Sequence, residues 1–270
     1  FKINNMLKRL LILVLFFQML SANAQITRIK IDRSSDTTGE VVMRLAHRFQ
    51  SYNWTPKHKF DHYDTSINSP KSVKYALDGS KFYVQSLEGY TTSIYNAESK
   101  KLIKTLIHGF TAANDSLFKD GETTIYNYPY KQNRKQKNVF LGKPVESCFS
   151  HKGKYLWVTY YRRDFDPIAQ SPSAVAIIDT ERDVIVRVMP TGPLPKMIAC
   201  SPDNKRIAVT HWGDNTVAII DIDSEDPFDF QFVKHSVVDY KMSTEFSSSH
   251  VNRDASCGFC LRGTAYTPDG

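Results

Sequence analysis

Motifs of the common catalytic classes are missing from this sequence. It contains no G-x-S-x-G nucleophile elbow, no G-x-x-x-x-G-K-[ST] phosphate loop and no G-x-G-x-x-G dinucleotide fingerprint. His58 and His62 lie four apart but have no further ligand at motif spacing, which favours a surface loop over a metal site. Asp164 and Asp166 are expected to be solvated in an inserted loop, with calcium binding as the alternative, so no metal and no other cofactor is predicted. Catalysis is therefore not evident, and the question of whether the chain is an enzyme stays open, leaning towards a non-catalytic protein.

A strong excess of one charge is also lacking. The chain has 35 basic and 28 acidic residues, a net charge of +7, and three of the basic residues lie within the first 24 positions, which leaves 32 against 28, or +4. Nucleic-acid-binding proteins usually carry a concentrated basic stripe. The only dense basic run is Lys131 to Lys137 (KQNRKQK), which is typical of a solvated loop. Nucleic acid is therefore disfavoured as a partner.

Apolar runs long enough to cross a membrane are absent. The longest, Leu10 to Leu20, has 11 residues broken only by Gln18, whereas a spanning helix needs about 20. Lys8 and Arg9 precede it and Ser21-Ala22-Asn23-Ala24 follows it, a pattern typical of a secretory signal peptide cleaved after Ala24. We expect residues 1–24 to be this signal, with 1–5 upstream of an initiator Met6. The prediction is a secreted or periplasmic protein with no transmembrane segment after cleavage.

Cysteine is scarce, with four residues in 270. Cys257 and Cys260 form a C-x-x-C, and Leu261 stands where c-type haem attachment requires His, which excludes haem c. Without a second C-x-x-C no structural zinc site is predicted. A local disulfide between Cys257 and Cys260 fits an oxidising compartment, with free thiols as the alternative. Cys148 and Cys200 are expected to be buried small hydrophobic residues.

Repeats are the main positive feature of the sequence. Asp-Gly-like turns recur, and a valine stands five residues after each of the first three, at Val84, Val158 and Val209. Strand-like segments rich in Val, Ile and Tyr surround each turn. We expect units of four short antiparallel strands, which is the composition of a β-propeller blade. The turns lie at 78–79, 152–153, 203–204 and 269–270.

One stretch carries a family resemblance. Residues 195–221, PKMIACSPDNKRIAVTHWGDNTVAIID, closely resemble the YVTN β-propeller repeat, as found in YncE-like and surface-layer propellers. The likeness to lactonase and haem d1 propellers is more distant. The resemblance implies an all-β propeller over residues 25–270, and one such fold hosts many unrelated activities.

The repeats are unevenly spaced, with successive turns 74, 51 and 66 residues apart. Blades of about 40–50 residues are usual, so we expect inserted loops near 110–142, 161–172 and 223–260. Because four turns do not close a typical ring, the sequence predicts part of a longer propeller of about seven blades.

A candidate ligand face follows from the repeat register. Lys71, Val145, Lys196 and Arg262 each lie eight residues before a turn, where the resemblance places the innermost strand. Cations around one tunnel mouth would focus a positive potential, although they could equally solvate blade edges. The adjoining loops add side chains that would line the same face, namely Tyr160, Arg162, His211 and Trp212.

Two functions follow. The first is a binding scaffold that recognises an anionic or polar ligand, or a protein partner, at this face, with Trp212 and Tyr160 as contact platforms and His211 either lining the face or anchoring its loop. The alternative is an exported propeller enzyme such as a lactonase-like hydrolase.

Overall fold

The computed structural model describes residues 33–35, 41–50, 61–120, 122, 138–169, 171–239 and 252–270. The predicted signal peptide and the basic run at 131–137 lie outside these residues. Within them, no helix is long and apolar enough to cross a membrane. The chain divides into two compact units, residues 1–49 with 54–62, and residues 50–53 with 63–270.

The smaller unit contributes little regular structure. An isolated antiparallel bridge joins Ser34 and Arg44. The short strands β1 (Arg48–Gln50) and β2 (Asp61–Tyr63) form a two-stranded sheet.

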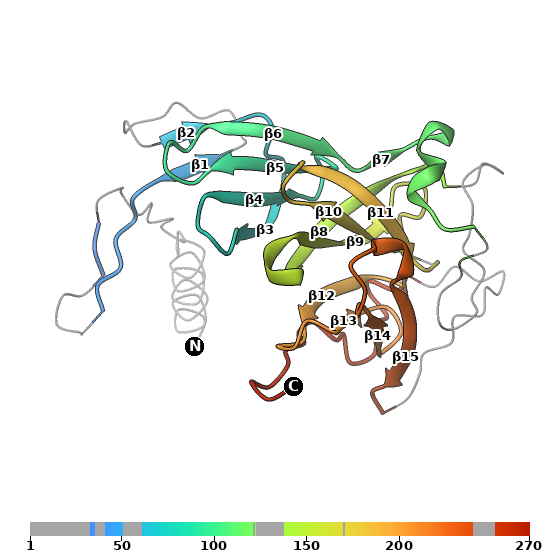
Figure 1. The fold of residues 1–270 in the computed structure, drawn as a ribbon. Helices are drawn as coiled ribbons and strands as arrows, with labels where there is room; N and C mark the ends of the chain where they lie inside the picture. Colours follow the sequence, from blue (N-terminus) through green and yellow to red (C-terminus); the bar gives the residue numbers. More distant parts are fainter. Residues whose placement is uncertain are drawn as a thin grey trace, which may run out of the picture. The chain divides into compact units, whose positions relative to one another are not determined.

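Two four-stranded antiparallel sheets in the larger unit have the predicted form of a blade (Figure 1). Each strand pairs with the next one along the chain, so each sheet is a meander. The first sheet consists of β3 (Pro70–Tyr75), β4 (Lys81–Ser86), β5 (Thr91–Asn96) and β6 (Leu102–Ile107). The second consists of β12 (Pro195–Cys200), β13 (Arg206–His211), β14 (Thr216–Asp221) and β15 (Gln231–Val237).

The sheet between them in sequence follows the same plan with one addition. It contains β8 (Phe140–Ser150), β9 (Tyr155–Arg163), β10 (Ala174–Asp179) and β11 (Val184–Pro190), and the short β7 (Gly109–Phe110) pairs with the start of β8. β9 has nine residues, whereas its counterparts β4 and β13 each have six.

The turns predicted from the repeats are present. Gly79, Lys152 and Asn204 have φ angles of +73°, +54° and +58°, the left-handed region that Gly and Asn adopt most readily. Asp78 Oδ1 accepts a hydrogen bond from the Ser80 amide at 3.0 Å, which closes the first turn. The sequence therefore located each β-turn because its chemistry is local.

The first strands of the three sheets are neighbours, with β8 in contact with both β3 and β12. Ser72 Oγ donates to the Val145 carbonyl at 2.6 Å, and Thr159 Oγ1 donates to the Lys196 carbonyl at 3.0 Å. The first bond joins the first strands of two adjacent sheets, and the second joins β9 to the first strand of the next sheet, β12. Sequential four-stranded sheets that meet through their first strands are the blades of a β-propeller, as predicted.

The hydrophobic core lies between the blades. Alternate residues of the middle sheet point to opposite faces. Leu156 belongs to a cluster shared with the first blade, and Trp157 belongs to one shared with the third. Both side chains are fully buried. Each blade therefore buries its faces against its neighbours, which is why repeats of this kind are stable only when stacked.

Within the predicted insertion near 223–260, residues 231–237 form β15, the fourth strand of its blade. The strand reads QFVKHSV and is largely exposed, so its hydrophobic pattern is weak. Shorter elements occupy the other predicted insertions: η1 (Ala112–Leu117) lies in 110–142, and β9 extends to Arg163. Residues 123–137 lie outside the described part of the chain.

Candidate functional site

A lysine lies against two aromatic rings where β12 begins. The Lys196 ammonium nitrogen is 4.0 Å from the centroid of the Tyr161 ring and 4.9 Å from that of Trp212. Tyr161 lies near the end of β9, and Trp212 directly follows β13. Neighbouring blades therefore bring these three side chains together.

Two arginines extend this group. The Arg262 guanidinium carbon is 4.7 Å from the Trp212 ring centroid, and that of Arg162 is 5.3 Å from the Tyr161 ring centroid. We call Lys196, Arg262, Arg162, Tyr161 and Trp212 the cation–aromatic cluster. Tyr161 and Trp212 are each only 8% exposed. The rings therefore support the cations and offer little open surface of their own.

The segment 252–262 holds one side of the cluster. The buried Arg253 donates to the Gly213 carbonyl at 3.1 Å, and Trp212 Nε1 donates to the Asp254 carbonyl at 3.4 Å. The structure pairs Cys257 with Cys260 in a disulfide whose Cα atoms are 4.8 Å apart. Cys257 is buried in the same hydrophobic cluster as Trp212. The disulfide thus closes a small loop immediately before Arg262.

Burial lowers the pKa of Lys196 to about 8. Charge repulsion from Lys71 and Arg262 contributes to this lowering, while Asp254 and Glu146 oppose it. Cation–π contacts also favour the ammonium, but the loss of solvent outweighs them. Among the described residues Lys196 forms no ion pair, so no adjacent carboxylate holds its proton.

Glu146 on β8 is a member of this site that the repeats did not reveal. Burial raises its pKa, against the attraction of Lys196, Lys74 and Lys71. A signal was available in the sequence, because Val145 is the one register position without a cation and Glu146 directly follows it. The surroundings of Lys196 therefore combine an unusually acidic ammonium with a carboxyl that holds its proton more tightly than usual.

Two predicted face residues lie elsewhere. Tyr160 is fully buried, and its hydroxyl lies 2.7 Å from His108 Nδ1 inside the core between the first two blades. Successive strand residues point to opposite faces, so Tyr161 takes the place predicted for Tyr160. His211 is also fully buried, with Nε2 2.8 Å from Thr191 Oγ1. It is an anchor of its loop and does not line the face.

The remaining predicted residues lie near one another. Lys71 is exposed at the start of β3 and acts electrostatically on Lys196, as does Arg262. Arg162 is half-buried beside Tyr161. Lys71, Lys196 and Arg262 therefore share one region.

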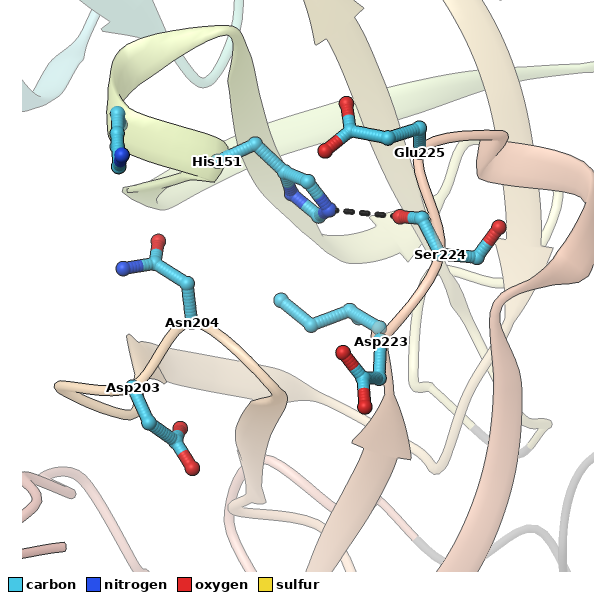
Figure 2. A pocket seen from close by; sticks show the side chains of 8 residues that line it. His151, Asp203, Asn204, Asp223, Ser224 and Glu225 are labelled. Carbon is cyan, nitrogen blue, oxygen red and sulfur yellow. Dashed lines mark hydrogen bonds between the residues drawn. The ribbon is translucent and has the colours of Figure 1, made fainter.

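A separate cavity of about 420 Å³ lies at the other end of the third blade (Figure 2). In Figure 2 the His151 ring points to the Ser224 backbone, whose carbonyl is 2.8 Å from Nε2. Asp203 and Asn204 come from the turn after β12. The repeats gave no indication of this cavity.

The charge in this cavity is largely compensated. Asp223 pairs with Lys205 and Glu225 pairs with Lys154, each at 2.8 Å. In the described part of the chain, no three His, Cys, Asp or Glu side chains gather as a metal ion would require. The cation–aromatic cluster is therefore the better candidate site.

Comparison with known proteins adds likenesses of fold only. No family model matches the chain, and no curated protein matches it in sequence. Membership of the YVTN family therefore stays a prediction.

Similar solved structures include the hydrazine synthase of Kuenenia stuttgartiensis, with 16% identity and a TM-score of 0.44 over 68% of this chain. Two 6-phosphogluconolactonase-like proteins are also similar. The one from Bacteroides fragilis has 18% identity and a TM-score of 0.44, and the one from Bacteroides uniformis has 15% and 0.43, each over 64% of this chain. The chain spans only 40%, 40% and 42% of these three chains. At these values none of their activities transfers to it.

Proposed function

We propose that this chain is a β-propeller binding protein that recognises an anionic group, a carboxylate or a phosphate, at the cation–aromatic cluster. One observation carries the proposal: Lys196 and Arg262 both lie over the Trp212 ring, at 4.9 and 4.7 Å. An aromatic face holds a cation in place without neutralising it. Neither cation forms an ion pair among the described residues, so both remain able to meet an incoming anion.

Electrostatics supports the same ligand class. Lys71 and Arg262 act on Lys196 through their charges, so three cations share one region. Clustered like charge beside low-dielectric walls focuses the local potential and raises the rate of anion capture. The ligand is a small anion or an anionic group on a partner protein, since both present the same chemistry.

The test is a calorimetric titration with inorganic pyrophosphate and with citrate at low salt. We expect the double variant Lys196→Glu, Arg262→Glu to bind at least about tenfold more weakly, since each lost charge-assisted contact costs about 1.5–3 kcal/mol. Lys205→Glu, Arg206→Glu is the matched control, because it makes the same charge change at the other end of β12–β13. Equal affinity of the double variant and the wild-type protein would refute the proposal.

A second candidate function is catalysis, such as lactone hydrolysis, and one observation favours it. The pKa of Lys196 is lowered and that of Glu146 is raised, and the two groups act on each other electrostatically. Pairs of this kind gather at active sites, where acid–base chemistry requires them. A panel of lactones assayed with the wild-type protein and Glu146→Gln tests this function, which is rejected if no lactone is opened faster than in buffer.

We also propose that the protein is exported. The predicted leader at 1–24 supports this, and so does the Cys257–Cys260 disulfide, because disulfides persist mainly in oxidising compartments. N-terminal sequencing of the secreted chain is expected to begin at Gln25. An uncleaved chain retained in the cytoplasm would contradict the proposal.

A further inference from the structure

We propose that Lys196 is a reactive amine that forms an imine with small aldehydes or ketones bearing a carboxylate or phosphate. This inference rests on the proposed function, because the neighbouring cations would hold the anionic end of such a compound. It adds a covalent step at one nitrogen that simple anion binding does not require.

The first argument is the surroundings of the amine. The Tyr161 and Trp212 rings lie 4.0 and 4.9 Å from Lys196 Nζ and are themselves nearly buried. Leu194, in the same apolar cluster as both rings, is fully buried. Water is therefore removed from much of the amine, and desolvation favours the neutral form of a lysine.

The second argument is the balance of charges around the amine. Lys71 comes from β3, Arg262 and Asp254 from the segment 252–262, and Glu146 from β8. The two cations disfavour the ammonium, the two carboxylates favour it, and desolvation is the largest effect. A lysine that is desolvated beside another cation is a known way to obtain a nucleophilic amine.

The third argument is position. The backbone of Lys196 is fixed because its carbonyl accepts from Thr159 Oγ1 at 3.0 Å. Arg262 lies over the same Trp212 ring as Lys196 and is exposed to solvent. A compound whose anionic group met Arg262 or Lys71 would bring its carbonyl group towards the Lys196 amine.

The reaction balances without a co-reactant. The neutral amine attacks the carbonyl carbon, the C–N bond forms, and the oxygen takes up a proton. The oxygen then leaves as water, so the two hydrogens of the amine leave with it and a C=N bond remains. Glu146, whose pKa is raised, is a nearby carboxyl group that can hold a proton.

The size of the effect follows from the pKa of Lys196. With a pKa of about 8, about a quarter of the amine is neutral at pH 7.5, against about 0.1% for an exposed lysine of ordinary pKa. A less basic amine is also a weaker nucleophile, which offsets part of this gain. We expect Lys196 to react at least about tenfold faster than the exposed lysines of the same chain.

The experiment uses pyridoxal 5′-phosphate and pyridoxal as probes, which differ by one phosphate group. The full chain is treated with each probe, reduced with borohydride and mapped by mass spectrometry. We expect pyridoxal 5′-phosphate to label Lys196 preferentially at pH 7.5, pyridoxal to do so less, and excess citrate to protect it. Labelling in proportion to exposure over all lysines, with no preference for Lys196, would overturn the proposal.

Variants sharpen the test. Lys196→Arg keeps the charge but removes the reactive amine, so the preferential labelling by pyridoxal 5′-phosphate is expected to disappear. In the control variant Lys205→Arg, preferential labelling of Lys196 is expected to remain. Folding of each variant is checked by its urea midpoint, and the wild-type map decides the question even if Lys196→Arg does not fold. If citrate still binds in calorimetry while Lys196 shows no preferential labelling, the reactive amine is refuted and the binding function stands. If citrate and pyrophosphate do not bind either, both proposals fail.

Discussion

Two buried histidines predict that the propeller loses stability in mild acid. His108 and His211 are fully buried, and burial lowers the pKa of each to about 3. Charge repulsion from His235 contributes, after burial, to the lowered pKa of His211. The fold therefore favours the neutral imidazoles, whereas in the unfolded chain they titrate near 6.5. Their stabilisation is complete above pH 6.5 and is lost as the pH falls.

The magnitude follows from the gap between the two pKa values. For each histidine, the free energy of unfolding falls by about 1.4 kcal/mol per pH unit below 6.5, until the pKa of the folded state is reached. Between pH 7.5 and 5.0 the loss is about 2 kcal/mol for each ring, or about 4 for both. Typical domains are stable by about 5–15 kcal/mol. Glu122 and Glu146, whose pKa values are raised by burial, have the opposite sign and offset part of this loss.

Urea unfolding at pH 7.5 and at pH 5.0 measures how much the free energy of unfolding falls between these two pH values. Because the glutamates act equally in every variant, the comparison of wild type with His108→Gln and His211→Gln isolates the two rings. Glutamine keeps a polar group that can bond the Thr92 and Thr191 hydroxyls, which lie 2.6 and 2.8 Å from the two rings. Each variant is expected to shrink the pH-dependent loss by about 2 kcal/mol. A loss of the same size in all three proteins would refute the reasoning.

Two further predictions concern packing and a buried ion pair. A Cβ on Gly192 would lie 2.5 Å from the fixed His211 ring, so Gly192→Ala is expected to lower the free energy of unfolding by about 1–3 kcal/mol. A Cβ on Gly263 would have nothing within 4 Å, so Gly263→Ala is expected to change this free energy by under about 0.5 kcal/mol. Equal urea midpoints for the two variants would contradict this prediction. The Arg187 guanidinium is fully buried and pairs with Glu122 at 2.7 Å, so Glu122→Gln is expected to cost about 3 kcal/mol in the same assay. An unchanged midpoint would show that the pair is not formed in solution.

The blades could be predicted because their signals are short-range. Turn residues at fixed offsets and Val-rich strands repeat whatever the distant packing is, and Gly79 and Asn204 adopt the left-handed conformation that their positions suggested. β15 escaped notice because a largely exposed edge strand does not need a clear hydrophobic pattern. Periodicity detects burial, so it fails where a strand is little buried.

The site was only partly predictable, and the reason lies in β9. This strand has nine residues where its counterparts have six. The repeat therefore gives no register for its last residues, and an error of one position exchanges the buried Tyr160 for Tyr161, which contacts Lys196.

The lowered pKa of Lys196 arises mainly from burial by neighbouring side chains that are not repeated from blade to blade. The register gives Lys71, Lys196 and Arg262 equivalent positions, and three equivalent cations alone would make a solvated ring of charge. Tyr161 at the end of a lengthened strand and Trp212 after β13 lie against one of the three, Lys196, and remove water from it. The repeats thus place the three cations near one another, while side chains that are not repeated bury Lys196 and so lower its pKa.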